Sequence, residues 1–366
     1  MSNPEKHSRR DFLQGRAAVR MAANQAQQWV DSASELLGSA SPPGPVVHVL
    51  ASRRAMACEF AVQYHEADEE LAEAVLAAFD VIESVEDQLT IYRDDSEVID
   101  INHRAAAEPV EVDRGLFELL ELCDRLYRDT DGAFDITSGP LSRVWGFLNR
   151  AGQLPDSSEL EYARSRVGAD AIRLDPNSQS IRFHNAATEI NFNSIGKGYA
   201  LDQVATQLDH DGHTDYLWHG GGSSVLARGK NRSGTQPGWT VGLKHPQRPG
   251  TRLAEVYLSD RALATAGGAT QFFEQDGQRY SHILDPRTGQ PAKGVYSSTV
   301  LAPSAAEADG LATAFFVMDV DAVEAYCQQH RHISAVLVCP VAEQSDFVVR
   351  AFGMTERDWT LINSGE

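Results

Sequence analysis

The sequence predicts an α+β fold in which antiparallel sheets are flanked by helices. Short apolar stretches typical of strands come in runs, and amphipathic helical stretches interrupt these runs instead of alternating strictly with single strands. The 366 residues are 42% hydrophobic and 23% charged, which is typical of a globular chain with a substantial core. No internal repeat is visible. We therefore expect one folded domain over residues 46–366, although the length also permits two modest domains.

The first 45 residues are predicted to form an arm that precedes this domain. Residues 8–13 (Ser-Arg-Arg-Asp-Phe-Leu) resemble a twin-arginine export signal, but charged and amide side chains interrupt the apolar core that should follow. We therefore favour a cytoplasmic location, with export to the periplasm as the alternative. Helically spaced apolar residues predict a docking helix over 17–37, and the Ser-Pro-Pro-Gly-Pro stretch at 41–45 predicts a linker.

The first half of the domain is predicted to combine hairpins with amphipathic helices. Two apolar stretches within 46–64 predict a hairpin, and an apolar stripe with a period of 3.6 residues predicts a helix over 68–89. The turn residues Asp175-Pro176-Asn177 predict a second hairpin between 171–174 and 181–184. The same criteria predict helices over 113–130, 137–148 and 195–208, and a strand over 188–193.

The second half is predicted to consist mostly of short strands before two closing helices. The residue pattern predicts strands at 216–218, 224–228, 239–243, 253–258, 271–274, 279–283 and 297–301. Helices are then predicted over 305–318 and 320–330, followed by strands over 333–339 and 346–352.

Charge and cysteine content exclude several classes of function. Lys and Arg total 32 against 52 Asp and Glu, and the net charge of -20 repels polyanions, so we expect no nucleic-acid partner. No apolar run reaches about 18 residues, so we expect no transmembrane segment. The four cysteines form no CxxC pair, which argues against structural zinc and leaves the redox compartment open.

The segment from Asn191 to Ala200 joins a predicted strand to a predicted helix. Free backbone amides and the helix dipole favour an anion at such a junction. Lys197 adds a positive charge, and the flanking Gly196 and Gly198 allow the backbone to approach a ligand closely. The segment predicts a phosphate or pyrophosphate site, with a simply capped helix as the alternative.

The segment from Tyr280 to Gly289 places several polar residues after a predicted strand. His282, Asp285 and Arg287 would supply an acid or base, a carboxylate and a phosphate-binding cation. The alternative is a well-formed turn beside a core histidine.

Two further segments offer oxygen ligands. Asp309 and Thr313 are four residues apart, so they share one face of a helix, and hard oxygen ligands suit Mg²⁺ better than zinc. Asp135 and Thr137 open a short predicted helix that is rich in aromatic residues. A solvated face or a helix cap is the alternative for the first pair, and a helix N-cap is the alternative for Asp135.

In their order along the chain, these segments resemble the FAD:protein FMN transferase family, also called the ApbE family. The resemblance covers roughly residues 48–340. Besides the four segments above, it includes Met56–Phe60, Leu89–Tyr92, Trp145–Phe147, Gly220–Gly222 and Trp239–Gly242.

The resemblance implies a T-fold-like α+β domain and a Mg²⁺-dependent enzyme. The enzymes of the family transfer FMN from FAD to a threonine side chain of a target flavoprotein and release AMP. By matching position, the FAD site would include Met56, Tyr92, Ala133, Phe134, Asp135, Asn191, Lys197 and Leu284, with Arg287 helping to offset the charge of FAD. Magnesium would be held by Ser194 through its backbone oxygen, Asp309 and Thr313. The catalytic residue would be His282, with Asp285 as a second candidate for the base.

The chain departs from the usual family pattern near this predicted site. Asn191 stands where the family usually has an aspartate, and Ala266, Ala269 and Gln271 replace the usual hydroxyl, aromatic and basic residues. Two alternatives therefore stay open. One is a hydrolase that cleaves the FAD pyrophosphate with water, giving FMN and AMP. The other is a non-catalytic FAD-binding protein.

Overall fold

The structure, a computed structural model, describes residues 48–362 apart from short gaps. These gaps are residues 66–67, 233, 235, 249, 269–270 and 342–345. The predicted arm over 1–45, with its twin-arginine-like segment, docking helix and linker, lies outside the described residues. In the described part of the chain, no helix is both long enough and apolar enough to span a membrane.

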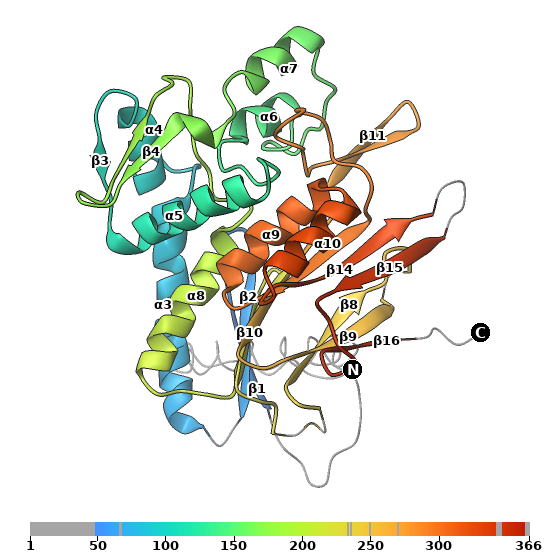
Figure 1. The fold of residues 1–366 in the computed structure, drawn as a ribbon. Coiled ribbons are helices and arrows are strands. Elements are labelled where there is room, and N and C mark those ends of the chain that lie inside the picture. The colour runs from blue at the N-terminus through green and yellow to red at the C-terminus, as the bar shows by residue number, and fades with distance from the viewer. Residues whose placement is uncertain are drawn as a thin grey trace, which may run out of the picture.

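An eight-stranded sheet forms the centre of the molecule (Figure 1). Its order is β1-β2-β6-β7-β10-β13-β14-β15, and all of its pairings are antiparallel. The strands are β1 (His48–Ala55), β2 (Cys58–His65), β6 (Tyr216–Gly220), β7 (Ser224–Arg228), β10 (Arg261–Gly267), β13 (Ser297–Ala302), β14 (Ser334–Pro340) and β15 (Phe347–Phe352). The predicted α+β class with antiparallel sheets is confirmed.

Helices cover one face of this sheet (Figure 1). They are α3 (Glu69–Leu89), α8 (Gly196–His210), α9 (Ala305–Val317) and α10 (Val320–Gln329). Successive strand residues point to opposite faces, so Trp218 of β6 packs on the helical side, where its ring lies 5.0 Å from that of Phe79 in α3. Nearly every residue of α9 is buried. A polar side chain on α9 is therefore shielded from bulk water.

A second, smaller sheet covers the other face. It consists of β8 (Trp239–Lys244), β9 (Arg252–Leu258) and β16 (Trp359–Leu361) in the order β16-β9-β8. Leu217 and Val225 of the central sheet pack with Trp239 and Val256 of the smaller one in a separate apolar core. The central sheet is therefore buried on both faces, which explains why strands such as β7 are buried almost throughout.

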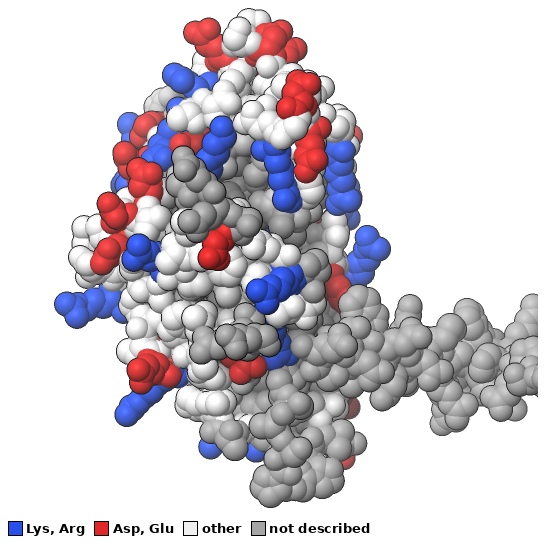
Figure 2. Space-filling view, turned by 90° about the vertical axis from the view of Figure 1, so that its right-hand side faces the viewer, with Lys and Arg blue, Asp and Glu red and all other residues white. Residues whose placement is uncertain are grey.

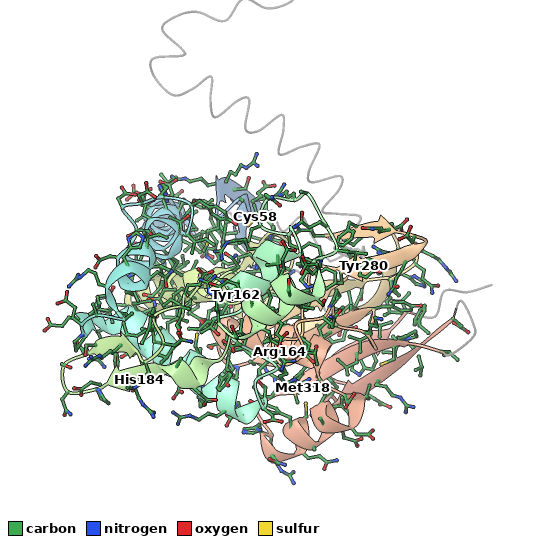
Figure 3. The ribbon with its side chains drawn as sticks, turned by 90° about the horizontal axis from the view of Figure 1, so that it is seen from above. Cys58, Tyr162, Arg164, His184, Tyr280 and Met318 are labelled. Atoms are coloured by element: carbon green, nitrogen blue, oxygen red, sulfur yellow. The ribbon has the colours of Figure 1, made fainter. Side chains whose placement is uncertain are left out.

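A cap of helices and short strands lies at the top of Figure 1. It comprises α4 (Glu97–Arg104), β3 (Val110–Glu111), α5 (Arg114–Asp129), α6 (Gly139–Val144), α7 (Ser157–Arg164), β4 (Ile172–Asp175) and β5 (Ser180–Phe183). Tyr162 and Arg164 mark α7 in the view from above (Figure 3). The ring of Trp145 lies 5.7 Å from that of Tyr280, so the cap packs against the hairpin of β11 (Phe272–Gln275) and β12 (Gln278–Ser281).

The predicted strand over residues 188–193 is wrong, because these residues form no strand. The Asn102 side chain bonds both the amide and the carbonyl of Ile190, and the amide of Asn191 donates to the carbonyl of Ile136. These contacts use the backbone amide and carbonyl groups that would otherwise form hydrogen bonds with a neighbouring strand. The pattern also missed α4, α7, β3, β10 and β16, and the predicted helix over 137–148 is shortened to α6.

Candidate active site

A large cavity with a volume of about 1220 Å³ lies where the cap, the central sheet and β8 meet. Most of the predicted site residues line it, although they are distributed over more than 250 positions of the sequence, roughly the length of a whole domain. They are Met56, Tyr92, Ala133, Asp135, Asn191, Ser194, Lys197, His282, Leu284, Asp309 and Thr313. The fold therefore brings the four segments singled out by the sequence to one place.

The carboxylate of Asp309 lies at the junction of α8, α9 and β7. Its Oδ2 accepts a hydrogen bond of 2.8 Å from the Gly198 amide and lies 3.6 Å from Lys197 Nζ. Its Oδ1 accepts a hydrogen bond of 2.7 Å from Ser224 Oγ. Asp309 is only 6% exposed, so these donors and the lysine charge replace much of the water that a carboxylate needs.

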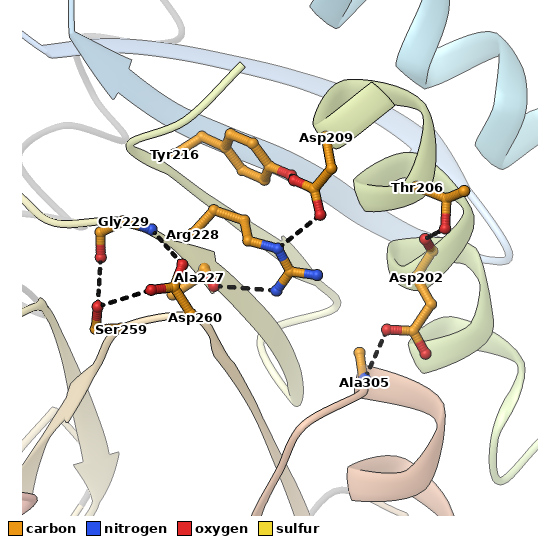
Figure 4. Close-up of polar contacts among 10 residues, drawn as sticks. All are labelled: Asp202, Thr206, Asp209, Tyr216, Ala227, Arg228, Gly229, Ser259, Asp260 and Ala305. Atoms are coloured by element: carbon orange, nitrogen blue, oxygen red, sulfur yellow. Dashed lines mark hydrogen bonds and ion pairs between the residues drawn. The ribbon is translucent and has the colours of Figure 1, made fainter. Parts of the chain in front are cut away.

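Two close contacts hold α8 and α9 together beside this carboxylate. Asp202 of α8 accepts hydrogen bonds from the first amides of α9, those of Ala305 (2.7 Å) and Ala306 (2.8 Å), and the first of them is drawn in Figure 4. Burial raises the pKa of Asp202 to about 6. The backbones touch at Gly198, where a Cβ atom would lie 2.1 Å from the carbonyl oxygen of Ala305. The positions of Lys197 and Asp309 are thus fixed relative to each other.

We expect Gly198→Ala to destabilise the protein, because the added methyl group meets backbone rather than a movable side chain. Overpacking of this kind lowers the free energy of unfolding by roughly 1–3 kcal/mol. Gly196→Ala is the matched control in the same helix, since its new Cβ would meet the flexible end of Met56 at 3.3 Å. Urea unfolding of both variants measures the difference, and equal midpoints would contradict the close packing of the helices.

The oxygen atoms beside Asp309 suit a magnesium ion. Thr313 Oγ1 lies 3.3 Å from the backbone oxygen of Asp309, one helical turn away, and both residues line the cavity together with Ser194. Among the described residues, no group of three or more His, Cys, Asp and Glu side chains could enclose a metal. Mg²⁺ does not need such an enclosure, because it commonly binds through one or two carboxylates and completes its shell with water and substrate phosphates. The donor set therefore fits this ion.

His282 enters the cavity next to the aromatic residues of the cap. Its Nδ1 lies 2.9 Å from the carbonyl oxygen of Gln271, and its ring meets that of Phe147 edge-on with 6.4 Å between the centroids. A carbonyl can only accept, so Nδ1 carries the proton and the neutral ring keeps Nε2 free to accept another. Burial, with a smaller contribution from Lys197, lowers the pKa of His282, so the imidazole is neutral at pH 7.

The neighbouring part of the cavity is built by the loop before α6. Asp135 accepts hydrogen bonds from the Thr137 amide (2.7 Å) and hydroxyl (2.6 Å), and burial raises the pKa of Asp135 to about 6. Asp135 is not a helix N-cap, because α6 begins at Gly139 after Ser138. Asn191 joins this loop through its own backbone amide, which donates to Ile136.

Three of the predicted site residues do not line the cavity. Asp285 accepts three hydrogen bonds from Arg287: from its amide (2.9 Å), Nε (2.9 Å) and Nη2 (3.1 Å). The two residues neutralise each other within one turn. The structure therefore does not place Asp285 as a base or Arg287 beside a ligand. Phe134 is 1% exposed and belongs to the main core.

Comparison with known proteins settles the family. The model of the ApbE family matches residues 56–337 of the chain. The chain belongs to the ApbE family.

Curated and solved members of the ApbE family show how far the likeness extends. The chain is 32% identical to an FAD:protein FMN transferase of Haemophilus influenzae over 66% of the chain and 71% of that protein. It is 36% identical to the protein of the same name from Vibrio cholerae, over 65% of the chain and 71% of that protein. The solved flavin transferase ApbE from Vibrio cholerae superposes with a TM-score of 0.73 and 29% identity, covering 84% of this chain and 98% of that one.

The predicted FAD and magnesium residues do not account for the whole cavity. Another part of its wall is formed by β8 and by parts of β10, β13 and β14, and four exposed basic side chains also line the cavity. Arg150, Lys244, Arg279 and Lys293 come from four separate segments of the chain. Sequence reasoning missed them because an isolated cation on a strand end or loop carries no spacing signal. Only the fold brings these four residues to one opening.

Proposed function

We propose that this protein transfers FMN from FAD to a threonine side chain of an acceptor flavoprotein and releases AMP, with Mg²⁺ bound at Asp309 and Thr313. The observation that carries the proposal is that one cavity holds the Lys197–Asp309 pair, the Thr313 hydroxyl and a neutral histidine. Membership of the ApbE family supports flavin transfer as the reaction. These residues also supply the groups that phosphoryl transfer needs: positive charge, oxygen ligands and a base.

The reaction is a substitution at the phosphorus of the FMN half of FAD. The threonine Oγ forms a bond to this phosphorus, and the bond from phosphorus to the bridging oxygen breaks. The bridging oxygen and its electron pair leave with AMP. The proton of the threonine hydroxyl passes to Nε2 of His282, the ring nitrogen that Gln271 does not occupy.

Negative charge grows on the pyrophosphate oxygens as the bond breaks. Mg²⁺, when bound, would neutralise part of that charge and hold the phosphates in place. Lys197 adds a second positive charge from the start of α8, where the helix dipole has the same sign. Asp309 keeps the lysine in place across a distance of 3.6 Å. The overall charge of -20 is thus reversed where an anionic substrate has to bind.

The flavin ring requires apolar and aromatic neighbours. Tyr92 lines the cavity with 68% of its surface exposed, which leaves its ring available for stacking. Met56 lies opposite the first turn of α8, with a thioether that adapts to flat ligands. Both residues support a flavin-binding role for this part of the cavity.

Release of AMP from FAD, with and without a threonine-bearing flavoprotein, tests the proposal. The full chain is incubated with FAD and Mg²⁺, AMP is quantified by chromatography, and the acceptor is checked for covalent flavin fluorescence after denaturation. We expect AMP and labelled acceptor in equal amounts, and neither of them with an acceptor whose threonine is changed to alanine. AMP without labelling would instead favour the pyrophosphate hydrolase. FAD binding without AMP would indicate a flavin-binding protein.

A further inference from the structure

The residues of the predicted FAD site line only part of the cavity. Its volume of about 1220 Å³ lies above the roughly 300–1,000 Å³ typical of pockets for drug-sized ligands. The residues of the predicted FAD site come from the β1–β2 turn, the cap and the first turns of α8 and α9. The remaining wall, toward β8 and β14, consists of apolar side chains such as Val241, Leu243 and Val338. The predicted FAD site therefore leaves this side of the cavity unassigned.

Exposed cations also line the cavity. Besides Lys197, the lining includes Arg150 after α6, Lys244 at the end of β8, Arg279 on β12 and Lys293 before β13. We call these four residues the basic rim. Figure 2 shows the side of the molecule where β8, β11 and the β14–β15 pair end, and Lys and Arg side chains border its hollowed part.

The charges of the basic rim are not neutralised within the described part of the chain. No described carboxylate lies within 4.0 Å of any of the four, whereas Lys197 is paired with Asp309. Arg279 instead lies over the ring of Phe272, with its guanidinium carbon 3.4 Å from the ring centre. In a protein with a net charge of -20, such a group of unpaired cations indicates a binding site for an anionic partner.

FAD is not that partner in our proposal, because its charge is already matched elsewhere. Its two phosphates carry about two negative charges. Lys197 and Mg²⁺, less the charge of the Asp309 carboxylate between them, supply about two positive ones in the proposed function. Four further cations exceed what the pyrophosphate needs. The rim is also spread over four separate segments of the chain, which suits an extended chain better than a compact ligand.

We propose that the basic rim binds an acidic segment of the acceptor protein, close to the threonine that receives FMN. This inference rests on the proposed function, because it assigns the remaining part of the cavity to the acceptor. Carboxylates facing Arg150, Lys244, Arg279 and Lys293 would steer the encounter and fix the register of the segment, so that its threonine reaches His282. The apolar wall beside β8 would pack against the side chains between the carboxylates.

Two synthetic peptides test this proposal. Both have one central threonine, flanked either by aspartate and glutamate or by asparagine and glutamine. Their affinity for the full chain, loaded with FAD and Mg²⁺, is measured by fluorescence anisotropy at low and at physiological salt. We expect the acidic peptide to bind about tenfold more tightly, and the difference to shrink as salt screens the charges. Equal affinities, or no binding of either peptide, would overturn the proposal.

Two double variants with the same change in net charge test whether the preference for the acidic peptide depends on the basic rim. Lys244→Glu/Lys293→Glu is expected to remove the preference for the acidic peptide. Arg173→Glu/Arg182→Glu changes the net charge equally on the exposed β4–β5 pair and is expected to keep that preference. Loss of the preference in both variants, or in neither, would contradict binding at the basic rim.

Measurements of FAD affinity and AMP release separate this proposal from the proposed function. We expect the rim variant to keep the FAD affinity of the unmodified chain. A rim variant that loses FAD affinity would show that the cations serve the nucleotide, and would overturn the docking proposal alone. A chain that neither binds FAD nor releases AMP would instead overturn the proposed function.

Discussion

Replacing Asp309 by asparagine is expected to reduce AMP release by about a thousandfold or more. The amide keeps the size of the side chain, but it removes the negative charge beside Lys197 and the anionic ligand for Mg²⁺. Loss of one preorganised electrostatic contact to a reacting group typically lowers the rate by about a hundredfold to a thousandfold, and here the metal charge is lost as well. The measurement is AMP release over a magnesium titration, with FAD affinity determined in parallel by fluorescence.

Glu86→Gln is the control for this result. Glu86 is a second carboxylate that lines the cavity, from α3, and it lies outside the Asp309–Lys197 pair. We expect this variant to keep both its rate and its magnesium dependence. Chelation of Mg²⁺ in the unmodified protein should reproduce the loss seen with Asp309→Asn. An Asp309→Asn variant with the same magnesium dependence as the parent would exclude this carboxylate as the metal ligand.

The chemical centre of the cavity could be predicted from sequence because each part of it is local. Lys197 follows a strand-like segment and opens a helix, and Asp309 and Thr313 share one helix face, so their spacing already indicates an anion site and an oxygen ligand pair. His282 follows directly after strand β12, in a short segment whose polar residues already indicate a site. Patterns of this kind depend on neighbouring residues alone, so the folded structure keeps the arrangement that they predict.

Features that depend on distant partners could not be predicted in this way. The residues at 188–193 resemble a strand, but the Asn102 side chain and the Ile136 carbonyl take their backbone bonds. Arg287 resembles a phosphate ligand, yet it pairs with Asp285 two residues away. Strand β10 was missed because its sequence is rich in alanine, which has a low strand propensity, and its two neighbours in the sheet stabilise it. The basic rim likewise arises only from tertiary structure.

Replacing His282 by asparagine is expected to lower the turnover rate by about a hundredfold to ten-thousandfold, the range typical of a lost general base. The amide can still bond the carbonyl of Gln271, so the local structure should be kept, together with FAD affinity. His184→Gln, at an exposed position outside the cavity lining, is the control and should behave like the parent. An asparagine variant with the parent's turnover rate would show that the threonine proton goes elsewhere.

The pH dependence of the rate is the sharper test of His282. Its pKa in the folded protein is lowered below the usual 6.5 by burial and by the charge of Lys197, so the imidazole remains unprotonated as the pH falls through 6.5. A base acts only in its unprotonated form, and the rate should therefore stay level through that pH and decline only as the pH falls through the lowered pKa. This acidic decline should be absent from the residual activity of His282→Asn. If the same decline persisted in the variant, the titrating group would be another residue of the cavity, and Asp135, whose pKa is raised to about 6, would be the one to substitute next.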